Sequence, residues 1–267
     1  MEKNRTAMKK KDFVVYTALF GNYDYLLEPV PSKDCDYICF TDNPLLKSNL
    51  WNIHVVPCSL SAKMMNRQYK IKPHNYLKDY KASIYLDSNI KILKDPIDLF
   101  DKYLRTSSFL AINHVERNCI YSEALSCIAS KRTDHKLTID QMFSYAREGY
   151  PTNNTLTENR ILVRSHNDKQ VIDLMNMWWN ELNAWAPRDQ LSLCFAAWKL
   201  KFTIGFISEN PRFKNDYFKW YPHKETEKRF FYRLTRKLRF HGRWILFFPE
   251  FAFKVGIIGK AIFNKST

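Results

Sequence analysis

The sequence predicts an α/β fold in which helices cover both faces of a mostly parallel sheet. Short runs rich in β-branched and aromatic residues alternate along the chain with longer amphipathic segments. This alternation is typical of strand–helix–strand units, whose strands lie parallel and are buried on both faces. The length of 267 residues suits one domain of this class with a sizeable core.

Each expected strand is a short apolar, β-branched or aromatic run that ends in a polar residue or turn former. In chain order, the expected strands cover residues 13–21, 36–42, 52–57, 82–87, 107–114, 159–166 and 202–207.

Helices are expected between these strands. Pro73 interrupts the first helical pattern, and Pro96 begins the next helix, since proline suits the first helical position. The expected helical segments are 61–80, 96–104, 120–130, 138–149, 168–183 and 187–200.

The composition excludes a disordered chain, because 45% of the residues are hydrophobic and 15% are aromatic. The formal net charge of +15 predicts a polyanionic partner such as nucleic acid, an anionic membrane surface or a phosphorylated small molecule. Residues 212–267 contain 14 Lys and Arg against 4 Asp and Glu, so +10 of this charge lies in the last 56 residues.

We therefore expect a domain over residues 12–210 and a basic, aromatic C-terminal arm over residues 211–267. The apolar stretch 245–263 contains a proline and three charged residues, which makes it too broken for a membrane-spanning helix. Two interpretations stay open. Either the arm lies on an anionic membrane surface, or it packs on the domain or on another subunit.

The N-terminal sequence MEKNRTAMKKKDF has no apolar stretch of the kind found in signal peptides. We therefore expect a cytoplasmic protein, with the arm as the candidate for contact with the inner face of the cytoplasmic membrane. The six cysteines show neither a C-x-x-C pair nor a zinc-ligand spacing. They are expected to be buried, reduced thiols, with a structural disulfide as the lesser alternative.

Polar residues follow several of the expected strands. In open α/β sheets, ligands bind beyond the carboxyl ends of the strands, which places residues 16–21, 41–43, 87–89 and His114 along one edge. Asp87 and Asn89, two residues apart at a strand end, can direct oxygen atoms to the same side. Oxygen ligands suit Mg²⁺ or Mn²⁺ bound to a phosphate, although an Asp–Ser–Asn sequence taken alone predicts an ordinary turn.

A series of blocks in this chain resembles, in order and spacing, a glycosyltransferase-like family of TOD/MUCI type found in bacterial polysaccharide loci and in plants. The blocks are VVYTALFGNYD, DYICFTD, NRQYKIKPH, YLDSNI, NHVERNCIYSEA, ENRILVRSHN and RDQLSL. They cover roughly residues 12 to 210, and the arm lies outside them. The strand-end aspartate, H-x-x-R-x-C-x-Y and R-D-Q are the most specific parts.

That family looks like the GT-A type of nucleotide-sugar transferase, so the resemblance implies a GT-A-like domain. It implies a D-x-D motif that holds a divalent ion, Mn²⁺ or Mg²⁺, against the donor's diphosphate. Asp87, Ser88 and Asn89 fall on this motif, and Asn89 replaces its second aspartate, which weakens the implied metal site.

The resemblance also implies donor contacts elsewhere. Arg67 and Lys70, one helical turn apart, would face the phosphates, although they also suit a solvated helix face. The residues implied to border the nucleotide are Tyr16, Thr17, Ala18 and Asp42. Tyr16 also suits a place in the core.

His114 lies on the expected ligand edge, and we expect it to contact sugar or phosphate as a catalytic residue, beside Arg117 as an acceptor contact. A lone histidine at a strand end is more often structural. In the R-D-Q block, the resemblance places Asp189 near the donor sugar and the acceptor, with Gln190 beside the donor. Asp189 would be the base of an inverting enzyme or the sugar-positioning residue of a retaining one, but it also suits a helix cap.

Residues 157–159 and 165–167 flank an expected strand. Glu158, Asn159 and His166 are therefore candidates for contact with the acceptor or a phosphate. His166 equally well belongs to the cap of the helix that follows.

The expected function is transfer of a sugar from a nucleotide-sugar donor to a saccharide or lipid-linked acceptor in bacterial surface polysaccharide (capsule or lipopolysaccharide) biosynthesis. One alternative is a protein that binds sugar nucleotide without turnover. Another is a nucleic-acid-binding protein that uses the basic, aromatic arm. The concentration of charge in an appendage without a nucleic-acid motif argues against this last alternative.

Overall fold

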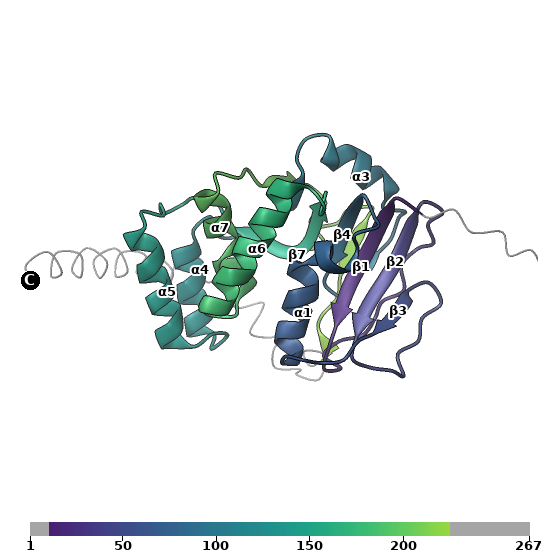
Figure 1. Ribbon diagram of the computed structural model, residues 1–267, viewed down its shortest axis with the longest axis horizontal. Coiled ribbons are helices and arrows are strands. Elements are labelled where there is room, and N and C mark those ends of the chain that lie inside the picture. Colours follow the sequence, from purple (N-terminus) through teal and green to yellow (C-terminus); the bar gives the residue numbers. More distant parts are fainter. Residues whose placement is uncertain (1–10, 225–267) are drawn as a thin grey trace, which may run out of the picture.

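The computed structural model describes residues 11–224, which form a seven-stranded mixed sheet and its covering helices (Figure 1). The strand order is β3-β2-β1-β4-β7-β6-β8. The strands of this sheet are β1 (Phe13–Leu19), β2 (Cys35–Thr41), β3 (Asn52–Val55), β4 (Ala82–Leu86), β6 (Phe109–Asn113), β7 (Thr157–Arg164) and β8 (Gly205–Ile207). Neighbouring strands pair in parallel except where β7 meets β4 and β6. The predicted α/β class and mostly parallel sheet are confirmed.

The helices occur where the sequence predicts them, with shifted ends. They are α1 (Ala62–Ile71), α2 (Pro73–Tyr76), α3 (Ile97–Leu104), α4 (Ile120–Ala129), α5 (His135–Arg147), α6 (Lys169–Ala184), the 3₁₀ turn η1 (Asp189–Leu191) and α7 (Leu193–Lys199). The predicted break at Pro73 is confirmed, because this proline begins α2. The helix expected over 187–200 is divided into η1 and α7, since Ser192 between them leaves helical geometry.

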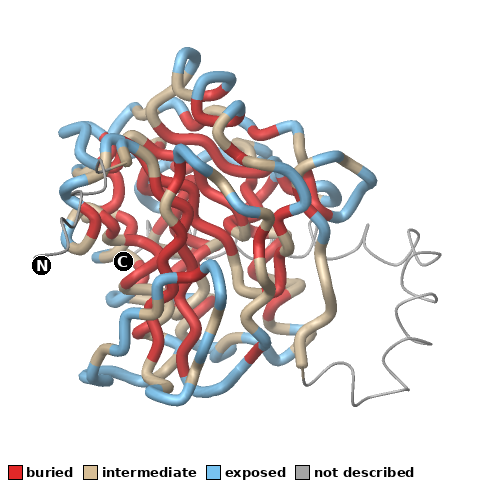
Figure 2. Tube along the Cα trace, turned by 90° about the vertical axis from the view of Figure 1, so that its right-hand side faces the viewer, coloured by how far each residue is buried: buried red, intermediate tan, exposed pale blue. Residues whose placement is uncertain are grey.

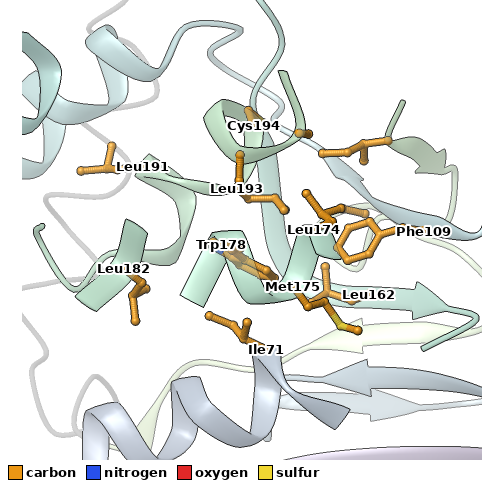
Figure 3. Close-up of a cluster of buried hydrophobic side chains, with 14 of the residues drawn as sticks. Ile71, Phe109, Leu162, Leu174, Met175, Trp178, Leu182, Leu191, Leu193 and Cys194 are labelled. Carbon is orange, nitrogen blue, oxygen red and sulfur yellow. The ribbon is translucent and has the colours of Figure 1, made fainter. Parts of the chain in front are cut away.

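Two hydrophobic clusters lie on the two faces of the sheet. Alternate residues of β1 serve different clusters: Val14 and Tyr16 join the one formed with α1 and α4–α7, and Val15 joins the one formed with α3. The central strands are therefore buried along their length (Figure 2), which explains why they read as continuous apolar runs. In the first cluster, the fully buried Trp178 of α6 lies near Ile71 of α1 and Met175 (Figure 3).

The antiparallel direction of β7 decides which residues share an edge of the sheet. Its first half lies beside the carboxyl end of β4, where the Asp87 N–H donates to the Arg160 carbonyl at 2.9 Å. Its last residue, Arg164, lies opposite Ser83 near the start of β4. The edge that follows the parallel strands, termed here the carboxyl edge, therefore contains Asp87 and the beginning of β7, whereas residues after β7 lie at the opposite edge.

A small antiparallel sheet of β5 (Ile90–Ile92) and β9 (Phe218–Trp220) was not predicted. Phe218 is buried in the cluster that contains α3, so the folded domain extends beyond the boundary expected at residue 210. The rest of the predicted arm, residues 225–267, lies outside the described residues. Within residues 11–224, no helix is long and apolar enough to cross a membrane.

Candidate active site

The carboxyl edge brings together two carboxylates and a buried lysine. Asp87, whose side chain is 33% exposed, accepts a hydrogen bond from the Tyr85 hydroxyl at 3.0 Å. The Lys70 ammonium lies 3.4 Å from Asp87 Oδ1 and 2.7 Å from Asp189 Oδ2, with its side chain only 2% exposed. Lys70 on α1 therefore bridges the carboxylate after β4 and the carboxylate of η1.

Asp189 is buried among cations. Burial alone would raise the pKa of its carboxyl group, but the neighbouring charges of Arg67, Lys70 and Arg188 hold this pKa well below its usual range. Arg67 is the more distant of the two α1 cations, 3.5 Å from Asp189 Oδ1. Because a general base works best with a pKa near the operating pH, this environment favours a positioning role for Asp189 over that of a base.

Two hydrogen bonds fix η1 to its neighbours. The Trp178 indole N–H donates to the Asp189 carbonyl at 3.0 Å, and the Gln190 side-chain amide donates to the Thr157 carbonyl at 3.3 Å. These bonds tie η1 to α6 and to the start of β7. Gln190 also accepts a hydrogen bond from Arg188, so its side chain is held by protein contacts, and its contact with the donor stays a prediction.

The residues predicted to border a nucleotide on β1 lie inside the protein. Tyr16, Thr17 and Ala18 are each buried on a central strand whose two faces are both covered. The Tyr16 hydroxyl donates to the Lys70 carbonyl at 3.0 Å and accepts from Arg164. Tyr16 therefore supports α1, and the burial of all three residues favours a structural role over the predicted contact with the nucleotide.

Asp42 shapes the turn after β1. Both of its carboxylate oxygens accept a hydrogen bond from the Gly21 N–H, at 3.1 and 3.0 Å. Gly21 has φ +68°, and a Cβ added there would lie 2.8 Å from the Ala62 Cβ, so both the conformation and the space require glycine. Asp42 lies on the carboxyl edge as predicted, where its visible role is to hold this turn.

His114 is buried and holds the loop after β6. Its Nδ1 accepts hydrogen bonds from the backbone N–H groups of Glu116 and Arg117, at 3.2 and 3.1 Å. Burial lowers the pKa of His114 to about 4, so the neutral ring carries its proton on Nε2, which lies 3.7 Å from Glu123 Oε2. Both ring nitrogens face protein groups, and this geometry favours a structural role over the predicted catalytic one.

Two buried glutamates hold four guanidinium groups at this edge. Glu123 lies 2.8 Å from Arg117 Nε and 3.5 Å from a terminal nitrogen of Arg188. Glu158 accepts contacts from Arg160 Nε at 2.9 Å and from Arg212 Nε at 3.1 Å. Six charged residues form these ionic contacts: Arg117, Glu123, Glu158, Arg160, Arg188 and Arg212. Only Arg117 and Glu158 of this set were predicted as site residues, because the sequence does not show which distant residues an arginine pairs with.

Glu158 and Asn159, predicted acceptor contacts, are both buried. Asn159 Oδ1 accepts a hydrogen bond from the Thr157 hydroxyl at 2.7 Å. Both residues lie at the carboxyl edge, where their side chains contact neighbouring protein side chains.

His166 lies at the opposite edge of the sheet, because β7 runs antiparallel. It is fully buried, and its Nε2 lies 2.8 Å from the Leu77 carbonyl. This position favours a structural role for His166 over the predicted acceptor contact.

Asn89 connects the turn after β4 to the C-terminal part of the domain. Its side-chain amide donates to the Tyr221 carbonyl at 2.9 Å, and the Tyr221 N–H donates to the Asn89 carbonyl at 2.9 Å. Nearby, Asp24 accepts from the Lys224 N–H at 3.1 Å and lies 2.5 Å from His223 Nδ1. Asp24 and His223 were missed in the sequence because they lie 199 residues apart.

These contacts describe the surroundings of the predicted metal pair. Asn89 is buried and committed to Tyr221, and Asp87 Oδ1 already contacts Tyr85 and Lys70. The hydrogen bond to Tyr221 uses the Asn89 side-chain nitrogen and fixes the orientation of this amide, so the role of Asn89 as a metal ligand stays a prediction. Within residues 11–224, no group of three or more His, Cys, Asp or Glu side chains is arranged to hold a metal ion. A Mn²⁺ or Mg²⁺ ion at Asp87 stays a prediction.

Replacing Asn89 by alanine is expected to loosen the segment around Tyr221. Loss of one neutral hydrogen bond costs about 1 kcal/mol, which corresponds to about fivefold faster exchange of the Tyr221 amide in hydrogen–deuterium exchange. Asn167→Ala is the matched control, because its side-chain amide bonds to the Lys78 and Tyr80 carbonyls at the opposite edge. Equal exchange at Tyr221 in both variants would contradict the assignment.

Acidification is expected to destabilise the fold through its buried histidines. Burial lowers the pKa of both His114 and His166 from 6.5 to about 4. As the pH falls from about 6.5 towards 4, these histidines bind protons in the unfolded chain before they do so in the folded one. The free energy of unfolding therefore falls. Each histidine accounts for a loss of about 2 kcal/mol between pH 7 and pH 5.

His166→Gln tests this effect, because glutamine can still donate to the Leu77 carbonyl without titrating. Urea unfolding at pH 7 and pH 5 should show that the variant loses about 2 kcal/mol less than the parent protein over this interval. An unchanged pH dependence would show that His166 is not the neutral group described above.

Comparisons with known proteins identify the family of this chain. Residues 1–219 match the family model described as TOD1/MUCI70, glycosyltransferase-like domain. No curated protein matches the chain. The solved structure of the galactosyltransferase LgtC in complex with donor and acceptor sugar analogues aligns with a TM-score of 0.42 and 12% identity, over 75% of this chain and 74% of LgtC.

The apo structure of the bifunctional glycosyltransferase WbbM aligns with a TM-score of 0.47 and 9% identity, over 75% of this chain and 39% of WbbM. The family assignment rests on the family model, which covers most of the chain. The protein belongs to the TOD1/MUCI70 glycosyltransferase-like family.

Proposed function

We propose that the protein transfers a sugar from a nucleotide-sugar donor and that the donor's diphosphate binds at the carboxyl edge, beside Asp87. The observation that carries this proposal is the Lys70 ammonium between Asp87 and Asp189, surrounded by further cations. Open α/β sheets bind ligands at this edge, and membership of a glycosyltransferase-like family supports the reaction class.

The charges at this edge suit a diphosphate leaving group. When the bond between the sugar and the diphosphate breaks, negative charge develops on the departing phosphate oxygen. Cations that are already fixed in place stabilise that charge without reorganising. Arg67 and Lys70 are fixed by contacts with Asp189, so in this proposal Asp189 positions the cations and the sugar.

The acceptor in this proposal is a saccharide or a lipid-linked saccharide of bacterial surface polysaccharide biosynthesis, as the family resemblance implies. The basic arm would hold the enzyme at the inner face of the cytoplasmic membrane, where anionic lipids attract clustered Lys and Arg. Liposome flotation of the full chain, with anionic and with neutral vesicles at several salt concentrations, tests this part separately.

The reaction is tested by incubating the full chain with UDP-, GDP- and ADP-sugars, with saccharide and lipid-linked acceptors, and with either Mn²⁺ or EDTA. Release of the nucleoside diphosphate is the readout. One donor should be consumed in an acceptor-dependent way. If no donor is consumed or bound under any of these conditions, the proposal is overturned.

A further inference from the structure

One face of α1 carries three cations. Lys63, Arg67 and Lys70 are spaced four and three residues apart, so their side chains lie on the same side of the helix. The helix lies against β1 (Figure 1). Arg188 adds a fourth cation to this group, because its charge also acts on Asp189. We call these four side chains the α1 cation cluster.

The cations of this cluster lie close enough to repel one another. Partial loss of hydration, and then the charges of Arg67 and Arg188, lower the pKa of the Lys63 ammonium. Among residues 11–224, no carboxylate oxygen lies within 4.0 Å of the Lys63 ammonium, whereas Arg67 and Lys70 both contact Asp189. Like charges gathered in this way are unfavourable unless an anion joins them.

The accessible members are the ones that can reach a ligand. Lys63 is exposed, and the side chains of Arg67 and Arg188 are 16% and 22% exposed. The Arg67 Nε is buried without a hydrogen-bond partner among the described residues. Lys70 is buried, so its ammonium is a fixed charge between Asp87 and Asp189. Arg67 and Arg188 each contact one carboxylate at 3.5 Å, and their other N–H donors can bind an anion together with Lys63.

This arrangement supplies the positive charge that the sequence assigns to a divalent ion. The Lys70 ammonium already lies between Asp87 and Asp189, so a positive charge stands beside Asp87 without a divalent ion. Guanidinium groups match phosphate geometry with two parallel donors, and a lysine ammonium provides a point charge with three. The chemistry of the site therefore fits a diphosphate held by side chains.

We propose that Lys63, Arg67 and Arg188 bind the donor's diphosphate directly, with Lys70 as the buried counter-charge, and that this binding requires no divalent ion. The identification of the diphosphate as part of a nucleotide sugar rests on the function proposed above. The binding of a diphosphate group to the α1 cation cluster does not depend on it.

The probe is inorganic pyrophosphate, titrated into the full chain by calorimetry in the presence of EDTA. Binding is expected, and the double variant Lys63→Gln, Arg67→Gln is expected to weaken it at least tenfold. Arg67→Lys in an otherwise unchanged chain should weaken it by only about threefold, because the charge remains and the paired donors are lost. Thermal unfolding of each variant verifies its fold.

Lys169→Gln is the matched control, because it removes an exposed positive charge at the start of α6. It should bind pyrophosphate as the unchanged protein does. The inference is overturned if pyrophosphate binds only when Mn²⁺ or Mg²⁺ is added, or if the double variant binds as tightly as the control.

The two proposals fail in different ways. If the chain binds pyrophosphate in EDTA but consumes no sugar nucleotide, the α1 cation cluster is supported and the transferase function is overturned. If sugar transfer occurs only with Mn²⁺, and pyrophosphate does not bind in EDTA, the function is supported and the metal-independent site is overturned.

Discussion

Replacement of Asp189 by alanine is expected to lower the free energy of unfolding by about 3–5 kcal/mol, because it leaves the buried Lys70 ammonium without its nearest counter-charge. That ammonium lies 2.7 Å from Asp189 Oδ2. Arg67 and Arg188 lose the same carboxylate, so three positive charges would then repel one another around an empty position.

Urea unfolding at neutral pH measures this loss. Asp173→Ala is the control, because Asp173 forms an exposed ion pair with Lys169 on α6, and such pairs are worth less than about 1 kcal/mol. The double variant Lys70→Met, Asp189→Ala should lose less than the sum of the two single variants, since the buried charge disappears together with its partner. Equal stability of the Asp189→Ala and Asp173→Ala proteins would contradict this account.

Replacement of Asp87 by alanine is expected to reduce sugar transfer by a factor of at least about 100 while the fold stays intact. Removing one fixed group that organises charge at a reaction centre costs about 2.7–4 kcal/mol of transition-state stabilisation. Asp87 is partly exposed and retains its backbone bond to Arg160 in the variant. The loss should therefore appear in kcat/KM rather than in the unfolding transition.

The assay compares the unchanged protein, Asp87→Ala and Asp98→Ala with the donor identified in the panel. Asp98 is an exposed carboxylate on α3 that pairs with Lys94, so its loss should leave transfer unchanged. Transfer by the Asp87→Ala protein at the rate of the Asp98→Ala control would remove Asp87 from the reaction.

The order of the main strands and helices could be predicted because hydrophobic periodicity and turn residues report on local structure. The direction of β7 could not, since a strand buried on both faces has the same pattern whether it runs parallel or antiparallel to its neighbours. That one reversal moves His166 to the opposite edge and brings Arg160 next to Asp87. The three-residue strands β5 and β9 are too short to give a periodic signal.

The candidate site was predicted in part for a related reason. Asp87, Lys70, Arg67 and Asp189 were selected individually, and the structure brings them into contact. The pairing between Lys70 and Asp189 has no local signature, because residues far apart in the sequence form it. Burial also decides roles that residue type leaves open: Tyr16 was selected as a ligand contact and is a core residue with a hydrogen-bonded hydroxyl.

The central position of β7 has a consequence for the synthesis of this protein. β7 lies between β4 and β6 in space but follows both of them in the chain. A ribosome that has not yet reached Thr157 therefore carries two strands whose facing edges lack their shared partner, and such edges are prone to pair with other chains. The nascent chain can complete its sheet only after more than half of the sequence has been translated, so solubility during translation depends on how quickly that late strand is inserted.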